Sequence, residues 1–244
     1  MKKYALLLLA LVFLSCNTVK EHTTTLVPGT QTARSYETHT SLRYLLYLPQ
    51  DYDPVRREGF PAILFLHGAG ERGDSVEAVA TWGPPRLARE KNLPFIVISP
   101  QCPKEHWWTS MMFELKGLLD QAIVQYNIDT TRIYLTGLSM GGYGTFAFSL
   151  LYPDYFAAVA PICGGGTPSM VNFVKDYPPI WVFHGNHDKI VPVESSTMMV
   201  EAMKNAGFNV KYTIYESGDH YIFKKVYADT SLFNWFLAHR KVTN

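Results

Sequence analysis

A serine flanked by glycines is the residue of this chain best suited to chemistry. Gly137, Ser139 and Gly141 form a Gly-x-Ser-x-Gly pentapeptide between the apolar run 133–135 and the helical stretch 145–151. A serine on such a sharp strand-to-helix turn has a strained backbone, and the glycines prevent a collision of side chains on either side of it. The turn projects the hydroxyl above the strand end, near the positive end of the next helix. Ser139 is therefore the candidate nucleophile.

A serine hydroxyl is a weak nucleophile until a base takes its proton, and His220 is the predicted base. It lies on the loop between the strand-like run 210–215 and the last helix, downstream of Ser139 as this motif class requires. The other seven histidines are less suited by their order or by their neighbours: His22, His39, His67, His106, His184, His187 and His239.

The base needs a carboxylate that fixes its tautomer and stabilises the imidazolium, and Asp188 is the predicted residue. It comes a few residues after the apolar run 180–183 and upstream of His220. Glu216, on the same loop as His220, is the alternative. The remaining acidic residues near these loops are less well placed: Asp176, Glu194 and Asp219.

Backbone amides suited to a developing oxyanion follow the apolar run 62–66, which leads into His-Gly-Ala-Gly-Glu-Arg-Gly. The N–H of Ala69 in this turn and that of Met140, directly after the nucleophile, are the predicted donors, with Gly70 as the alternative to Ala69. The polar side chains of the turn are expected to have structural roles. His67 should stabilise the turn itself, and Glu71 and Arg72 should form a local ion pair that holds the loop.

The elements that must position these residues alternate along the chain. Continuous apolar runs without alternation predict strands that are buried on both faces, hence a mostly parallel sheet covered by helices. The predicted strands are 42–48, 62–66, 95–98, 133–135, 157–160, 180–183 and 210–215, and the clearest helices are 113–126, 194–205 and 224–239. This order indicates an α/β doubly wound fold, in which chemistry gathers at the carboxyl ends of the strands.

Composition excludes several classes of function. The 244 residues are 47% hydrophobic and 18% charged, which is too apolar for a disordered chain. Lys+Arg 22 against Asp+Glu 21 gives a net charge of +1, so nothing indicates a nucleic-acid partner. We find neither a Gly-x-Gly-x-x-Gly turn after a strand nor a His, Cys and Asp cluster at metal-ligand spacing, and therefore expect no cofactor and no metal.

The N-terminus is typical of an export signal. A positively charged start at residues 1–3 is followed by an apolar run at residues 4–14 and then by Ser15-Cys16. The apolar run is too short for a membrane-spanning helix. This resembles a bacterial lipoprotein signal, which implies that residues 1–15 are removed and Cys16 is lipidated. We expect a flexible tether at 16–34, a catalytic domain at 35–244, and an exported protein that contacts the cell-envelope membrane through its lipid only. An ordinary cleaved signal is the alternative.

The motifs together resemble the α/β-hydrolase superfamily. The stretches 66–73, 100–103, 132–144 and 184–192, with Trp107-Trp108, are most similar to bacterial secreted esterases, a group also labelled prolyl-oligopeptidase-like or feruloyl-esterase-like. The resemblance implies Ser139, Asp188 and His220 as a triad on a mostly parallel central sheet with helices on both faces. Residues 74–91 and 163–177 are too short for a large cap domain. The superfamily strand order separates Cys102 and Cys163 by about 14 Å, beyond the roughly 7 Å that a disulfide spans, so both thiols should be free.

These observations favour a serine carboxylesterase that acts on small-molecule or carbohydrate-linked esters, such as acetyl or feruloyl esters, through an acyl-enzyme. Trp108 and Trp107, on the same rim as Ser139, are the candidates for stacking on a sugar or phenolic ring. A serine peptidase with the same triad is the alternative, and an inactive carbohydrate-binding lipoprotein is a third hypothesis.

Overall fold

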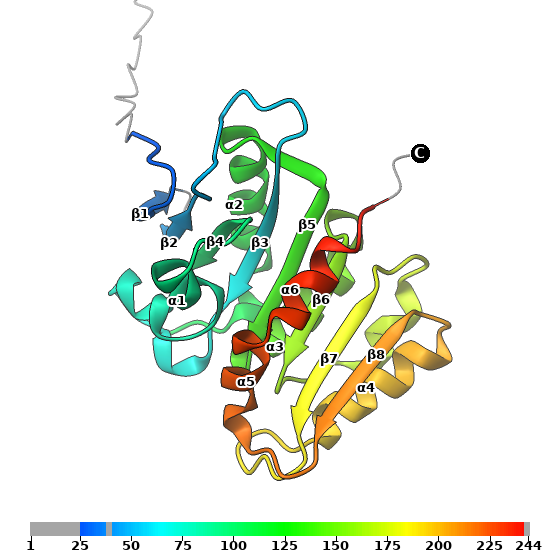
Figure 1. Ribbon diagram of the computed structural model, residues 1–244. Helices are drawn as coiled ribbons and strands as arrows, with labels where there is room; N and C mark the ends of the chain where they lie inside the picture. Colours follow the sequence, from blue (N-terminus) through cyan, green and yellow to red (C-terminus); the bar gives the residue numbers. More distant parts are fainter. Residues whose placement is uncertain (1–24, 38–40, 242–244) are drawn as a thin grey trace, which may run out of the picture.

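A single sheet of eight strands organises the computed structural model, which describes residues 25–37 and 41–241 (Figure 1). The strands lie in the order β1-β2-β4-β3-β5-β6-β7-β8. From β4 to β8 all neighbours are parallel, whereas β1 pairs with β2 and β2 with β4 in antiparallel fashion. The strands are β1 (Gln31–Tyr36), β2 (Leu42–Tyr47), β3 (Phe60–Leu66), β4 (Ile96–Pro100), β5 (Ile128–Leu138), β6 (Ala158–Ile162), β7 (Ile180–Gly185) and β8 (Val210–Tyr215).

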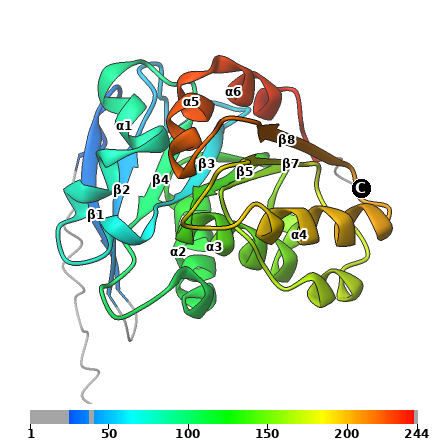
Figure 2. The same ribbon diagram turned by 90° about the horizontal axis from the view of Figure 1, so that it is seen from below.

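Helices cover both faces of the sheet, as the all-apolar strands predict. One face carries α2 (Met112–Gln125), α3 (Met140–Leu151) and α4 (Glu194–Asn205), and the other carries α1 (Gly83–Glu90), α5 (Phe223–Ala228) and α6 (Thr230–Leu237) (Figure 2). Each face has its own buried cluster, with Leu115, Phe146 and Met199 in the first and Phe95 and Phe236 in the second. The sheet is thus fixed from both sides, and its strand ends are held in place.

All seven predicted strands are present, and the prediction of a mostly parallel sheet is confirmed. The tether expected to end at residue 34 was wrong in its last part, because Gln31–Tyr36 forms the edge strand β1. The helix expected over 224–239 divides at Asp229, whose carboxylate accepts a hydrogen bond from the Ser231 N–H and starts a new helix. Helix α1 was not predicted, and it lies inside the expected insertion 74–91.

Cys102 and Cys163 follow β4 and β6, which lie three positions apart in the sheet. Both side chains are buried and free, as expected. The predicted signal at residues 1–15 and Cys16 lie outside the described residues. Within the described ranges, every helix is too short or too polar to span a bilayer.

Candidate active site

Ser139 occupies the sharp turn between β5 and α3. Its backbone has φ 55° and ψ −118°, a conformation that residues with a side chain rarely adopt. A Cβ atom at Gly141 would lie 1.9 Å from the carbonyl oxygen of Leu66, and one at Gly137 would lie 2.4 Å from that of Gly141. Only glycine fits at both positions, so the pentapeptide allows the close approach of backbones that this strained turn requires.

A continuous hydrogen-bonded chain joins the three residues that the sequence proposes as a triad. His220 Nε2 lies 2.9 Å from Ser139 Oγ, and His220 Nδ1 lies 2.6 Å from Asp188 Oδ2. Because the ionised carboxylate can only accept, Nδ1 carries the proton and Nε2 is left to accept the serine proton. The residues follow β5, β7 and β8, whose carboxyl ends meet at the lower edge of the sheet in Figure 1. The arrangement suits general-base activation of the hydroxyl.

The carboxylate of Asp188 is held on both oxygens. While Oδ2 faces His220, Oδ1 accepts the backbone N–H groups of Ile190 and Val191, each at 2.9 Å. Burial opposes ionisation of this side chain, but the hydrogen bonds from His220 and from these two amides outweigh it and lower the pKa of Asp188. Asp188 is therefore a fixed anion aligned with the base.

Glu216, the alternative acid, forms its hydrogen bond with a residue other than His220. Its side chain is exposed and accepts a hydrogen bond from the Asn186 amide at 3.3 Å. Asp219, next to His220 in sequence, instead accepts the backbone N–H of Tyr221 and caps the short helix that begins at the base. Among these acids, only Asp188 contacts the imidazole.

A second histidine, which the sequence analysis set aside, supports the acid. His184 is fully buried, with Nε2 2.9 Å from the Val191 carbonyl oxygen and 3.3 Å from Asp188 Oδ2. Burial lowers the pKa of His184, so its neutral ring faces the carboxylate.

Cys163 approaches the same carboxylate from β6. Ligand atoms of Cys163, His184 and Asp188 lie within 4.8 Å of one another, so the structure does bring together a set of groups that could hold a metal. The oxygens of Asp188 and the nitrogens of His184 already have hydrogen-bond partners. Burial also raises the pKa of the Cys163 thiol, which disfavours the thiolate that a metal requires. The cluster therefore fits a positioning role behind the acid.

The two backbone amides predicted to bind the oxyanion lie at helix starts. Ala69 begins the short 3-10 helix Ala69–Glu71, and Met140 begins α3, so neither N–H has a partner within its own helix. Across the described ranges, no hydrogen bond uses either of these two donors. Fixed, unpaired amides are the groups that stabilise an oxyanion without titrating. Gly70, the alternative, is exposed at the surface of the turn.

His67 and Trp108 form the buried support of this turn. The His67 ring donates from Nδ1 to the Gly68 carbonyl at 2.6 Å and accepts the Cys102 N–H at Nε2, at 2.9 Å. The indole of Trp108 donates to the His67 carbonyl and packs edge-on against its ring. The structural role expected for His67 agrees with this geometry. The expectation that Trp108 stacks on substrate was wrong, because its side chain is completely buried.

Trp107 remains on the rim, with 51% of its surface exposed. The Arg72 guanidinium lies 5.1 Å from its ring centre and donates to the carbonyls of Ala69 and His106. The expected ion pair of Arg72 with Glu71 is absent from the described residues, since Glu71 is buried behind the turn, where burial raises its pKa. Arg72 thus ties the amide-bearing turn to the tryptophan loop.

Comparison with known proteins agrees with this geometry. A family model described as "Putative esterase" matches residues 71–203, more than half of the chain. The chain belongs to this esterase family. A model of the prolyl oligopeptidase family also matches residues 167–243. A thermostable esterase of known structure is 34% identical, with a TM-score of 0.75 over 86% of this chain and 63% of the other. The sheet and these matches together show the α/β-hydrolase fold.

Two curated relatives carry esterase names. A bifunctional acetylxylan esterase/xylanase of Neocallimastix patriciarum is 30% identical over 159 residues, 60% of this chain and 21% of that protein. Carboxylesterase SOBER1 of Arabidopsis thaliana is 26% identical over 196 residues, 67% of this chain and 84% of that protein. The chain thus spans about a fifth of the length of the first relative.

Proposed function

We propose that this protein is a serine carboxylesterase. The observation that carries the proposal is the hydrogen-bonded chain from Asp188 through His220 to Ser139. The amides of Ala69 and Met140, which begin helices and have no hydrogen-bond partner in the described residues, support it. Esterase family membership and the esterase relatives support the same reaction class.

The geometry supports a specific role for each group in this reaction. Ser139 Oγ attacks the ester carbonyl while His220 Nε2 takes its proton, and the amides of Ala69 and Met140 bind the oxyanion. The C–O bond to the alcohol then breaks, and the imidazolium returns the proton to the departing oxygen. Water, deprotonated by the same nitrogen, attacks the acyl-enzyme. The bond from the acyl carbon to Ser139 Oγ then breaks, the imidazolium returns its proton to Oγ and the acid is released, while Asp188 stabilises the imidazolium in both steps.

Bulky esters are the proposed substrates. The described residues form no large cap in the loops around the site, and Trp107 presents an exposed aromatic surface on the rim. An aromatic or sugar ring linked to the ester could stack on this indole. We therefore propose carbohydrate-linked acetyl or feruloyl esters as the substrate class, to be ranked with a panel of acetyl, butyryl, feruloyl and phospholipid esters.

Substitution of the nucleophile tests the proposal. Ser139→Ala should lower turnover of an aryl ester by about three orders of magnitude or more and abolish labelling by a fluorophosphonate probe, without a change in melting temperature. Ser217→Ala, on the exposed loop before the base, is the matched control and should keep wild-type turnover. A Ser139→Ala protein that retains most of its activity would refute the assignment.

A peptidase with the same triad is the second candidate, because the prolyl oligopeptidase model matches residues 167–243. A matched ester and anilide with the same acyl group separate the two functions. Turnover of the anilide at a rate comparable to the ester would favour the peptidase.

We also propose export and N-terminal lipidation, on the basis of residues 1–16 of the sequence. Metabolic labelling with a palmitate analogue should tag the wild-type protein and leave Cys16→Ser untagged. Equal labelling of both would contradict lipidation at this cysteine.

A further inference from the structure

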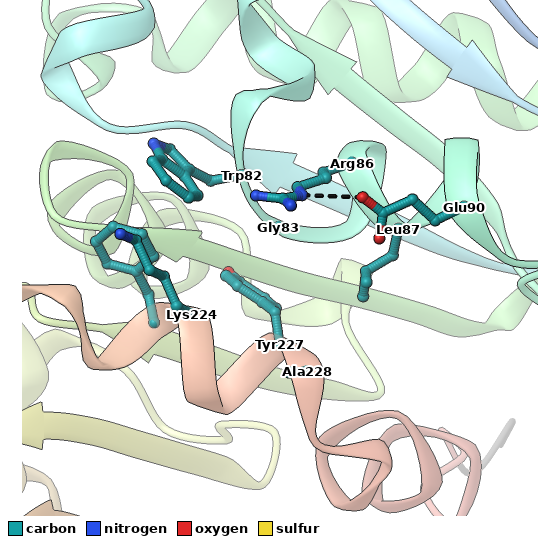
Figure 3. Close-up of a pocket in the computed structure, with 9 residues that line it drawn as sticks. Trp82, Gly83, Arg86, Leu87, Glu90, Lys224, Tyr227 and Ala228 are labelled. Atoms are coloured by element: carbon teal, nitrogen blue, oxygen red, sulfur yellow. Dashed lines mark hydrogen bonds and ion pairs between the residues drawn. The ribbon is translucent and has the colours of Figure 1, made fainter.

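A pocket of about 310 Å³ lies between α1 and α5, next to the segment that carries the base (Figure 3). Its floor is apolar and includes Trp82, Leu87, Phe223 and the ring of Tyr227. Two ring contacts connect it to the catalytic histidine: the Phe223 ring lies 5.6 Å from that of Trp82 and 6.3 Å from that of His220. The Phe223 ring thus both lines the pocket and contacts the catalytic histidine.

Two cations border this apolar floor. Arg86 from α1 and Lys224 from α5 reach toward Trp82, with Arg86 Cζ 5.7 Å and Lys224 Nζ 4.5 Å from an indole ring centre (Figure 3). The one carboxylate in the lining belongs to Glu90, which binds Arg86 through Nε at 3.1 Å. In the described part of the chain, the Nζ of Lys224 has no carboxylate partner. The pocket therefore has uncompensated positive charge at its border.

An apolar floor beneath two cations selects a flat ring that carries a carboxylate. The carboxylate would take charge-assisted hydrogen bonds from the Arg86 Nη groups and from Lys224, while the ring packs on Trp82 and Phe223. A sugar acid fits less well, because its hydroxyls would lie against aromatic carbon without partners. We propose that the α1–α5 pocket is a binding site for an aromatic carboxylate, separate from the site at Ser139.

This site goes beyond the proposed esterase activity and does not depend on it, because binding can be measured without turnover. It would have a direct relation to that activity if the substrates are esters of aromatic acids. Each turnover would then release a ligand of this class next to the pocket. The site would in that case retain or sense the product.

Calorimetric titration of the Ser139→Ala protein with cinnamate tests the proposal, since this variant cannot turn over an ester. One cinnamate should bind per chain, and Lys224→Met or Arg86→Gln introduced into it should each weaken binding about tenfold. Lys225→Met removes the same charge from the next residue of α5, which is exposed and outside the pocket, and should leave the affinity unchanged.

Chemical analogues of the probe complete the test. Cinnamyl alcohol, which lacks the charge, should bind at least tenfold more weakly than cinnamate, and glucuronate should bind more weakly than cinnamate. The proposal is overturned by an absence of cinnamate binding, by equal affinity in Lys224→Met and Lys225→Met, or by glucuronate binding more tightly than cinnamate. None of these outcomes bears on whether Ser139 is the nucleophile.

Discussion

The neutral, buried ring of His67 makes the stability of the fold depend on pH in a way that can be calculated. Burial and, to a smaller extent, the nearby Arg72 guanidinium together lower the pKa of His67 from 6.5 to about 4, although the hydrogen bond to Gly68 opposes the shift. In the unfolded chain the same ring titrates near its ordinary value. Between pH 6.5 and 4 the unfolded state therefore binds more protons, and stability decreases as the pH falls through this window.

The expected size of the effect follows from the difference between the two pKa values. One pKa unit corresponds to about 1.4 kcal/mol. The neutral ring therefore contributes about 3 kcal/mol to the free energy of unfolding above pH 6.5, and this contribution is lost once the pH has fallen below 4. At pH 5 the linkage relation gives a loss of about 2 kcal/mol. His67→Gln removes this titration, although a glutamine oxygen can still accept the Cys102 N–H that the ring accepts.

Urea unfolding at pH 7.5 and pH 5.0 measures the effect. The free energy of unfolding should decrease between these pH values by about 2 kcal/mol more in the wild type than in His67→Gln, because all carboxylates contribute to both proteins alike. His187→Gln, at an exposed position on the loop after β7, should behave as the wild type. An equal decrease in the wild type and in His67→Gln would show that the buried ring does not stay neutral.

Two further substitutions test the site geometry. Asp188→Asn should lower kcat by about four orders of magnitude, because an amide cannot replace both contacts of the carboxylate. Glu216→Gln should leave kcat unchanged. The reverse order of the two effects in an aryl-ester assay would identify Glu216 as the acid. Gly141→Ala should destabilise the fold by about 3 kcal/mol or more, because its Cβ would overlap the Leu66 carbonyl. The Cβ of Gly70→Ala would meet no atom within 4 Å, so this variant is the control. Equal melting temperatures for the two variants would contradict the packing described for this turn.

The triad candidates were predictable because their positions depend on order and spacing along the chain. Buried parallel strands leave continuous apolar runs, and Ser139 and Asp188 come shortly after such runs, whereas His220 follows the half-exposed edge strand β8 and was predictable from its order in the chain. Edge strands lack this signal. The residues of β1 are polar or half-exposed, because the strand pairs with β2 on one side only, and the sequence therefore resembled a tether.

Other features depended on contacts between distant residues, which spacing does not reveal. Trp107 and Trp108 are adjacent and chemically identical, and only the short 3-10 helix that begins at Trp108 turns its ring inward onto His67. Arg72 was expected to bind its neighbour Glu71, but the carbonyl of His106 and the Trp107 ring are its partners. The approach of Cys163 to Asp188 likewise requires the sheet to place β6 beside β7.

The loops after β7 and β8 are joined to each other by main-chain hydrogen bonds. The N–H of Asn186 donates to Tyr215 at 2.9 Å and that of His187 to Gly218 at 2.8 Å, and the Gly185 backbone lies too close to Asp219 for any side chain. The two parts of the site that bear the acid and the base therefore cannot separate unless the edge of the sheet opens. On heating, loss of catalytic competence should coincide with melting of the β7–β8 pair, and an inactive but otherwise folded species should not accumulate.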